Sequence, residues 1–227
     1  MGDIAHNLAR ISDTIAAAAK KSGRSASDIR LVGVTKSIGI DDIRHLVDMG
    51  VTNLGENRVQ DFLPKYEALV GPNIPTWHFI GHLQRNKVKY IIDKVAMIHS
   101  VDSLALAQEI DKRAGQAGRI MDVLIEINIA AEDSKHGIAP EQLLPLAADI
   151  AALNNIRLKG LMCIAPFVEN SEENRPHFEK MRNLFLDINS RQLHNHLTEL
   201  SMGMSGDYDI AIEEGATMVR IGTALVS

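Results

Sequence analysis

Short apolar runs alternate with amphipathic segments along most of the chain. In residues 4–21, Ile4, Leu8, Ile11 and Ile15 form one stripe at helical spacing, which predicts an amphipathic helix. After this helix, strands are predicted at residues 31–36, 53–57, 76–81, 97–102, 123–130, 156–165, 199–204 and 218–223. Helical patterns lie between them, near residues 40–50, 58–70, 86–94, 104–117, 140–153, 172–192 and 208–215.

This alternation predicts an α/β protein with a single (β/α)8 TIM barrel. Residues 123–127 (VLIEI) are almost continuously apolar, as expected for a parallel sheet that is covered on both faces. No helical pattern follows the eighth strand, so we expect the helix at residues 4–21 to take the place of the eighth helix. The alternative is a Rossmann-like open sheet, but the chain lacks a Gly-x-Gly-x-x-Gly turn after the first strand. No linker-like segment divides residues 1–227, and one domain is expected.

Composition and charge exclude some classes of function. The 227 residues are 45% hydrophobic and 23% charged, and the net charge is −5. This balance argues against nucleic acid or an anionic membrane as the main partner. Cys163 is the only cysteine, so no internal disulfide can form. No apolar stretch approaches the length of a membrane span, and no signal peptide is recognisable, so we expect a cytoplasmic protein.

In a barrel of this type, working residues lie at the carboxyl ends of the strands. Lys36 ends the run LVGVTK, where strand alternation places it on the same face as Val32 and Val34. If that face is the barrel interior, burial would lower the pKa of the amine and make it a nucleophile toward aldehydes. The alternative is a strand-end lysine whose ammonium group extends into solvent.

Two loops at the end of the chain have the composition of a phosphate site. The segment SMGMSGD at residues 201–207 and the segment RIGT at 220–223 follow the seventh and eighth strands. Small residues let backbone N–H groups approach an anion, and hydroxyl groups add donors. Barrels of this type frequently bind phosphate with these two loops. The alternative is an ordinary helix cap and turn.

Other polar residues are less informative. His78 and His82 are four residues apart but on a strand and its loop, so no metal site is expected. Cys163 lies within an apolar strand and is expected to be a buried small side chain. The loop at residues 82–87 could bind a carboxylate or a partner, or simply be a solvated helix start. Lys135, in the loop DSKHG at residues 133–137, is either an exposed lysine or a second acceptor for an aldehyde.

Five segments resemble a known family: VTK at residues 34–36, GENR at 55–58, HFIGHLQRNK at 78–87, LSMGMS at 200–205 and VRIGT at 219–223. In these segments the chain resembles the pyridoxal phosphate homeostasis proteins, which are similar to the barrel domain of alanine racemase without its second domain. The resemblance extends from Ile29 to Thr223, and the string at residues 78–87 is highly specific. The family usually ends with an aromatic–glycine pair, where this chain has LVS at residues 225–227.

The resemblance implies that pyridoxal 5′-phosphate forms a Schiff base with Lys36. It further implies a set of cofactor-binding residues: Asn57 near the ring oxygen, Arg220 beside the pyridine nitrogen, and Ser201, Gly203, Ser205, Gly222 and Thr223 around the phosphate. It also implies intracellular homeostasis of the cofactor, by storage, buffering or delivery, with apo enzymes that require it as recipients. We expect a monomer.

Arg220 bears on catalysis. A guanidinium donates only and stays charged, so it favours an unprotonated pyridine nitrogen and a weak electron sink. Arg220 could also be a strand-end residue paired with a surface carboxylate. In alanine racemase a tyrosine from the second domain is the second base, whereas Tyr66, Tyr90 and Tyr208 lie on predicted helices. We therefore predict no appreciable turnover. The alternatives are an amino-acid racemase of weak activity that uses pyridoxal phosphate, and a cofactor-free barrel isomerase acting on a sugar phosphate.

Overall fold

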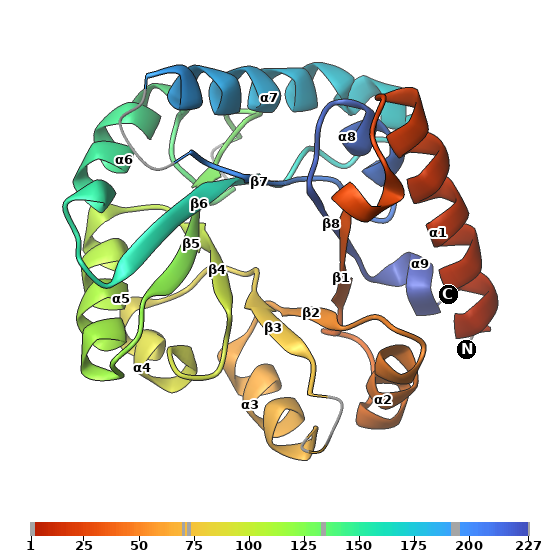
Figure 1. Ribbon diagram of the computed structural model, residues 1–227, viewed down its shortest axis with the longest axis horizontal. Coiled ribbons are helices and arrows are strands. Elements are labelled where there is room, and N and C mark those ends of the chain that lie inside the picture. Colours follow the sequence, from red (N-terminus) through yellow and green to blue (C-terminus); the bar gives the residue numbers. More distant parts are fainter. Residues whose placement is uncertain (1–2, 70, 72–73, 133–134, 192–195, 227) are drawn as a thin grey trace.

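A computed structural model of the chain describes residues 3–69, 71, 74–132, 135–191 and 196–226. Within these residues eight strands pair in parallel and in sequence order, and β8 pairs with β1, so the barrel is closed (Figure 1). The strands are β1 (Arg30–Val34), β2 (Asn53–Glu56), β3 (Thr76–Phe79), β4 (Met97–Val101), β5 (Met121–Ile127), β6 (Ile156–Cys163), β7 (Glu199–Ser201) and β8 (Met218–Ile221). The predicted (β/α)8 fold is confirmed.

Helices surround the barrel (Figure 1). They are α1 (Ile4–Lys21), α2 (Ile40–Asp48), α3 (Val59–Ala68), α4 (Val88–Ile91), α5 (Leu104–Gln116), α6 (Leu143–Ala151), α7 (Arg175–Ser190), α8 (Tyr208–Glu213) and α9 (Thr223–Val226). Short 3-10 turns are η1 (Ala26–Asp28), η2 (Arg85–Lys87), η3 (Pro140–Gln142) and η4 (Ser171–Asn174). The predicted helix ends at residues 70 and 192 lie outside the described residues, as do residues 133–134 of the predicted lysine loop.

The strands are shorter than the sequence predicts. Each ends one to three residues before its predicted carboxyl end, while β5 begins two residues earlier than predicted. After β3 and β6, apolar residues (Ile80, and Ile164 with Ala165) continue beyond the point where the backbone leaves the sheet. Gly203, predicted as part of the seventh strand, has a φ of +91°, which a strand cannot accommodate. The segments beyond the strands form the loops that carry the polar residues of the mouth.

Helix α1 packs against the last two helices of the chain, α8 and α9 (Figure 1). Its stripe of Ile4, Ile11 and Ile15 is buried, and the Asn7 side chain donates to the backbone oxygen of Leu225 at 3.2 Å. The prediction that α1 fills the place of an eighth helix is therefore confirmed. The structure adds one correction, because a single helical turn, α9, does follow β8.

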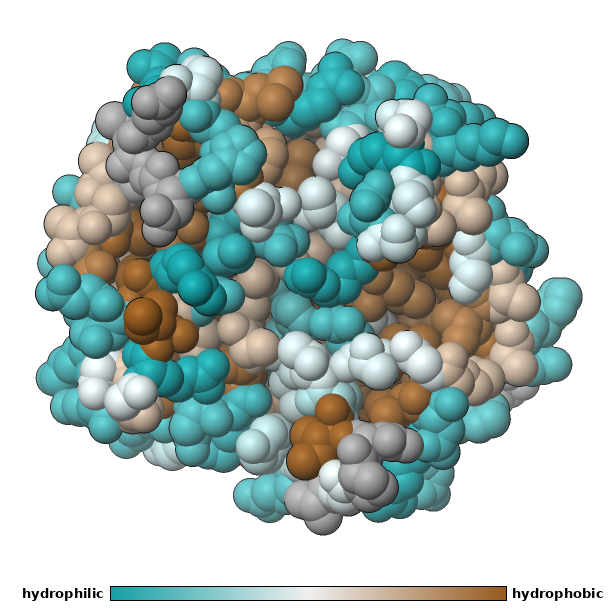
Figure 2. Space-filling view, in the orientation of Figure 1, coloured by the Kyte–Doolittle hydropathy of each residue, from teal (hydrophilic) through white to brown (hydrophobic). Residues whose placement is uncertain are grey.

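The core has an outer layer and a barrel interior. The large cluster lies mostly between strands and helices, and Met97, Leu124, Met162 and Met218 form a separate cluster. Alternation along β4 and β8 places Met97 on the face of His99 and Met218 on the face of Arg220. Hydrophilic side chains cover much of the rim in Figure 2, with hydrophobic residues showing between them.

Among the described residues, no helix combines the length and apolar character needed to cross a membrane.

Candidate functional site

A cavity of about 390 Å³ opens beyond the carboxyl ends of β1, β6, β7 and β8. Five residues predicted from the sequence line it: Lys36, Ser205, Arg220, Gly222 and Thr223. The rest of its wall is formed by residues 164–168, Val34, Lys135, Asn174, Met204, Gly206 and Asp207. The closed barrel therefore brings an amine, a guanidinium and both small-residue loops to one cavity.

Lys36 lies in the turn after β1 and is exposed at the cavity. The prediction that it is the last residue of the strand is wrong, because β1 ends at Val34. The backbone turns at Thr35, whose amide still bonds to the oxygen of Gly55 at 3.1 Å and whose side chain is fully buried. The amine of Lys36 is thus accessible to water and to a ligand in the cavity.

A buried ion pair holds the residue before Lys36. Lys65 on α3 places its Nζ 2.5 Å from Oε1 of Glu56 and 2.6 Å from the backbone oxygen of Thr35. The Thr35 hydroxyl donates to the same Glu56 oxygen at 2.6 Å. Glu56 is fully buried, so these bonds replace the water that its carboxylate loses. The hydrogen bonds among Lys65, Glu56 and Thr35 therefore hold the turn that carries Lys36.

Backbone donors converge on Ser205 at the cavity wall. Its Oγ accepts from the N–H of Gly222 at 3.2 Å and from the N–H of Ala224 at 3.3 Å. The loop is shaped by Asp207, whose carboxylate accepts from the N–H of Met204 at 2.7 Å. Neighbouring backbone N–H groups and a hydroxyl are the donors with which proteins bind phosphate.

Gly203 determines the backbone conformation of this loop. With φ at +91°, it adopts a conformation that side chains rarely tolerate. A Cβ at this position would lie 2.5 Å from the Cβ of Ala211 and 3.0 Å from the Cα of Tyr208. The backbone of the loop after β7 therefore packs directly on α8. Gly203 is buried and does not line the cavity.

Arg220 projects from β8 to the floor of the cavity and is almost fully buried. Nη1 donates to Oγ of Ser201 at 2.8 Å, and Nη2 donates to the backbone oxygen of Cys163 at 2.7 Å. Burial lowers the pKa of Arg220, and the carboxylates of Glu126 and Asp207 act in the opposite direction. These contacts leave no room for the alternative of a surface ion pair at Arg220.

A line of hydrogen bonds runs from Arg220 across the barrel interior. His99 Nδ1 lies 3.1 Å from Oγ of Ser201, and His99 Nε2 lies 2.9 Å from Nδ1 of His78. His78 Nε2 lies 3.1 Å from Oδ1 of Asn53 at the other end. Because β4 and β7 are not neighbours in the sheet, the contact between His99 and Ser201 crosses the interior.

The chemistry of the two ends sets the direction of these bonds. Arg220 can only donate, and the carboxamide oxygen of Asn53 can only accept. With both imidazoles neutral, Ser201 then donates to His99, His99 donates to His78, and His78 donates to Asn53. Burial, with a smaller effect from the charge of Arg30, lowers the pKa of His78 to about 4. Burial also holds the pKa of His99 well below its usual value.

The structure does not bring three predicted residues to the cavity wall. Ser201 is fully buried beneath Arg220, and Gly203 lies behind its loop. Asn57 lines a separate pocket of about 190 Å³ with His82, and its Oδ1 is buried without a hydrogen-bond partner.

Sequence reasoning missed several residues of the site. His99 interrupts the apolar run MIHSV of β4, and this buried polar position was a signal that could have been used. Asn174 on η4 donates to Asp207 at 2.8 Å and lines the cavity, but nothing local in the sequence connects it with residue 207. Cys163 is a buried side chain as predicted, and burial raises the pKa of its thiol to about 12.

Comparisons with known proteins agree with this geometry. The family model described as "Alanine racemase, N-terminal domain" matches residues 3–227. A pyridoxal phosphate homeostasis protein of Aquifex aeolicus is 47% identical over 218 residues, covering 96% of this chain and 95% of the relative. One from Escherichia coli K12 is 40% identical over 231 residues, covering 99% and 96%. The structure of PipY from Synechococcus elongatus PCC7942 with PLP bound is similar at a TM-score of 0.86, with 32% identity, and covers 99% of this chain and 100% of PipY.

The fold and the cavity thus define a barrel of the alanine racemase N-terminal type. The chain belongs to this family and, within it, to the pyridoxal phosphate homeostasis proteins. The resemblance seen in the sequence is confirmed.

Proposed function

We propose that this chain binds pyridoxal 5′-phosphate in the cavity at Lys36 and takes part in its homeostasis by storing, buffering or delivering it. The observation that carries the proposal is that an amine, a buried guanidinium and a hydroxyl held by backbone N–H groups line one cavity. The solved relative PipY, described with PLP bound, supports the same assignment.

The cavity residues fit a phosphorylated aldehyde. Lys36 supplies the primary amine. The Ser205 hydroxyl, whose oxygen accepts from the N–H groups of Gly222 and Ala224, can donate its own hydrogen to a phosphate beside Thr223. In this proposal Gly203 shapes the phosphate loop and Ser201 orients Arg220. Asn57 lines a separate pocket after β2 and would approach the ring oxygen from there. When bound, the cofactor supplies an aldehyde that condenses reversibly with amines.

We further propose that the chain has no appreciable catalytic turnover. Arg220 is a permanent donor held by Ser201 and Cys163, so it favours a ring nitrogen without a proton and a weak electron sink. The described tyrosines lie on helices, as predicted, with Tyr66 on α3, Tyr90 on α4 and Tyr208 on α8. Exposure of Lys36 instead suits release to water or to an incoming amine, including that of an apo enzyme. A cytoplasmic monomer stays our prediction.

Borohydride reduction of the cofactor-loaded protein, followed by peptide mapping, tests the site. We expect the reduced cofactor on the peptide that contains Lys36 and a loss of visible absorbance in Lys36→Ala. Lys135→Ala is the matched control, because Lys135 lines the same cavity. Label on another lysine would contradict the assignment.

Chiral chromatography after incubation with L-alanine tests the absence of turnover. We expect no D-alanine above the level of the Lys36→Ala protein. Conversion that disappears in Lys36→Ala would favour the racemase alternative.

A further inference from the structure

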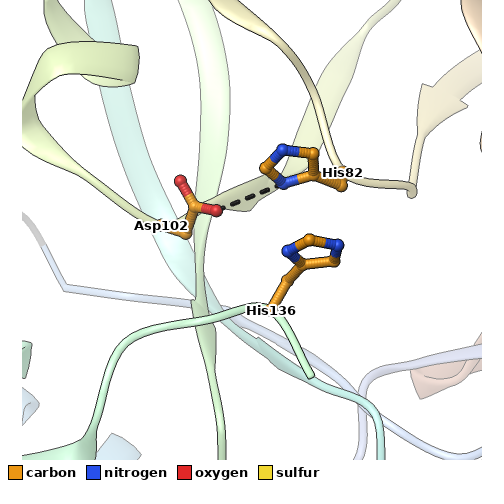
Figure 3. Close-up of side chains that lie close together, drawn as sticks. All are labelled: His82, Asp102 and His136. Carbon is orange, nitrogen blue, oxygen red and sulfur yellow. Dashed lines mark ion pairs between the residues drawn. The ribbon is translucent and has the colours of Figure 1, made fainter. Parts of the chain in front are cut away.

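Three side chains that the proposed cofactor site does not use converge at the opposite side of the barrel mouth. His82 follows β3, Asp102 follows β4, and His136 lies in the loop after β5 (Figure 3). One ligand-type atom of each residue lies within 4.8 Å of the others. From these residues we propose that His82, Asp102 and His136 form a binding site for a divalent transition-metal ion of the zinc class.

The distances agree with this chemistry. Nδ1 of His82 lies 3.3 Å from Oδ2 of Asp102. A charge-assisted hydrogen bond between these groups would be about 2.7–2.9 Å long. Two ligands of a tetrahedral zinc ion, each bonded at about 2.0–2.2 Å, are about 3.3–3.5 Å apart. The observed spacing is that of an ion pair, and it also falls within the range for two ligands of one ion.

The carboxylate is oriented by a neighbour in the manner of a metal ligand. The hydroxyl of Ser103 donates to Oδ1 of Asp102 at 3.2 Å, which leaves Oδ2 facing His82. Ser103 is itself held as the N-cap of α5, where its oxygen accepts from the N–H of Leu106 at 3.4 Å. Hydrogen bonds of this kind to a ligand fix its direction and strengthen metal binding.

The backbone positions of both histidines are also constrained. Before His82, Gly81 packs so closely that a Cβ would lie 2.2 Å from the backbone oxygen of Asn57. After His136, Gly137 has a φ of +104°, and Ile138 forms a bridge to Ile127 at the end of β5. Two loops far apart in sequence are thus held with their imidazoles together.

The rings of His82 and His136 stack with centroids 4.0 Å apart and an angle of 13° between their planes (Figure 3). Because an imidazole nitrogen binds a metal in the plane of its ring, one of the two rings has to turn about its side-chain bonds before both bind the same ion. Two imidazoles and one carboxylate are a ligand set that zinc accepts, and three protein ligands leave a position open for water or another donor. His82 is 40% exposed at its side chain, so an ion can reach the cluster from solvent. The bound ion would fix the loop that carries Lys135 into the cofactor cavity.

Calorimetric titration of the tag-free full-length chain with ZnCl2 alone, in a buffer without chelators, tests the proposal. We expect one zinc ion per chain and an affinity that falls at least about tenfold in Asp102→Asn and in His136→Ala. His45→Ala is the matched control, because His45 is exposed on α2, away from the cluster. Absence of binding, or binding unchanged in both ligand variants, would overturn the proposal.

Two further measurements keep the test decisive. Zinc X-ray absorption of the wild-type protein should show only nitrogen and oxygen neighbours with imidazole scattering, and a sulfur neighbour would refute the site even if a variant failed to fold. Zinc binding should persist in Lys36→Ala. Its loss there would show that the ion is held by the cofactor and not by the cluster, so this proposal and the proposed function fail separately.

Discussion

The Nζ atom of Lys65 lies 2.6 Å from the backbone oxygen of Thr35, and this bond links helix α3 to the residue that precedes the cavity amine. The same ammonium pairs with Glu56 at 2.5 Å. The position of Lys36 therefore depends on a buried charge that belongs to another element.

Replacing Lys65 by methionine should destabilise the protein by about 3–5 kcal/mol, because the carboxylate of Glu56 would stay buried without its partner. Urea unfolding measures this loss. Lys180→Met on the exposed face of α7 is the control and should change the free energy of unfolding by less than about 0.5 kcal/mol. A similar small effect in both variants would show that the cluster does not support the turn.

Gly203→Ala should destabilise the protein by about 2–4 kcal/mol, because the alanine would carry both a strained φ and a clash with Ala211. Gly118→Ala separates these causes. Gly118 also has a positive φ, of 64°, but no atom lies within 4 Å of a Cβ built there. We expect a cost of only about 1 kcal/mol for Gly118→Ala. Equal losses in thermal unfolding would mean that packing against α8 is unimportant.

Stability should fall as the pH drops from 6.5 toward 4, because the buried His78 resists protonation. The pKa of His78 in the folded protein is about 4, below the ordinary value of 6.5. Between these two pH values the unfolded chain binds more protons than the folded protein, so lowering the pH stabilises the unfolded state. Across the whole pH window, this pKa difference corresponds to a loss of about 3 kcal/mol in the free energy of unfolding.

Urea unfolding between pH 5 and pH 7 checks this dependence. His78→Gln should give a shallower slope of unfolding free energy against pH than the wild type, and His45→Gln on α2 is the control. An unchanged slope in His78→Gln would contradict a neutral His78.

A double-mutant cycle should detect the hydrogen bond that crosses the barrel. His99→Leu removes the acceptor of the Ser201 hydroxyl and the donor to His78, and an unpaired buried group costs about 1–3 kcal/mol. Ser201→Ala should therefore cost less in the His99→Leu background than in the wild type, with a coupling of about 1 kcal/mol. Additive losses would argue against the bond.

Hydropathy patterns predicted the barrel well because a parallel strand and its covering helix each bury a periodic apolar face. The positions of Lys36 and Arg220 at one mouth followed from the same pattern, since all strands of such a barrel point the same way. Hydropathy does not predict where a strand ends, because the end depends on the backbone hydrogen bonds to the neighbouring strands. This is why Lys36, expected on β1, lies in the turn beyond it.

The remaining errors concern contacts between distant elements. Ser201 is a small polar residue of the kind found in phosphate-binding loops, but it lies beneath Arg220. The reason is that β7 includes Ser201, and the loop begins only after it. The four-residue spacing of His78 and His82 does not indicate a metal site, whereas His82 meets Asp102 and His136 in space. No local sequence pattern predicts such contacts, because they form only when the loops after successive strands come together at one end of the closed barrel.

The packing of α1 on α8 and α9 has a consequence for how the chain folds. The apolar stripe of α1 leaves the ribosome before the helices on which it packs are synthesised, and Asn7 meets a residue 218 positions later. During synthesis this helix must stay without its docking surface, exposed to chaperones and to other chains. We expect the pairing of β8 with β1 to form late in folding. This pairing closes a long loop of chain, and local helix formation cannot offset the entropy that the closure costs.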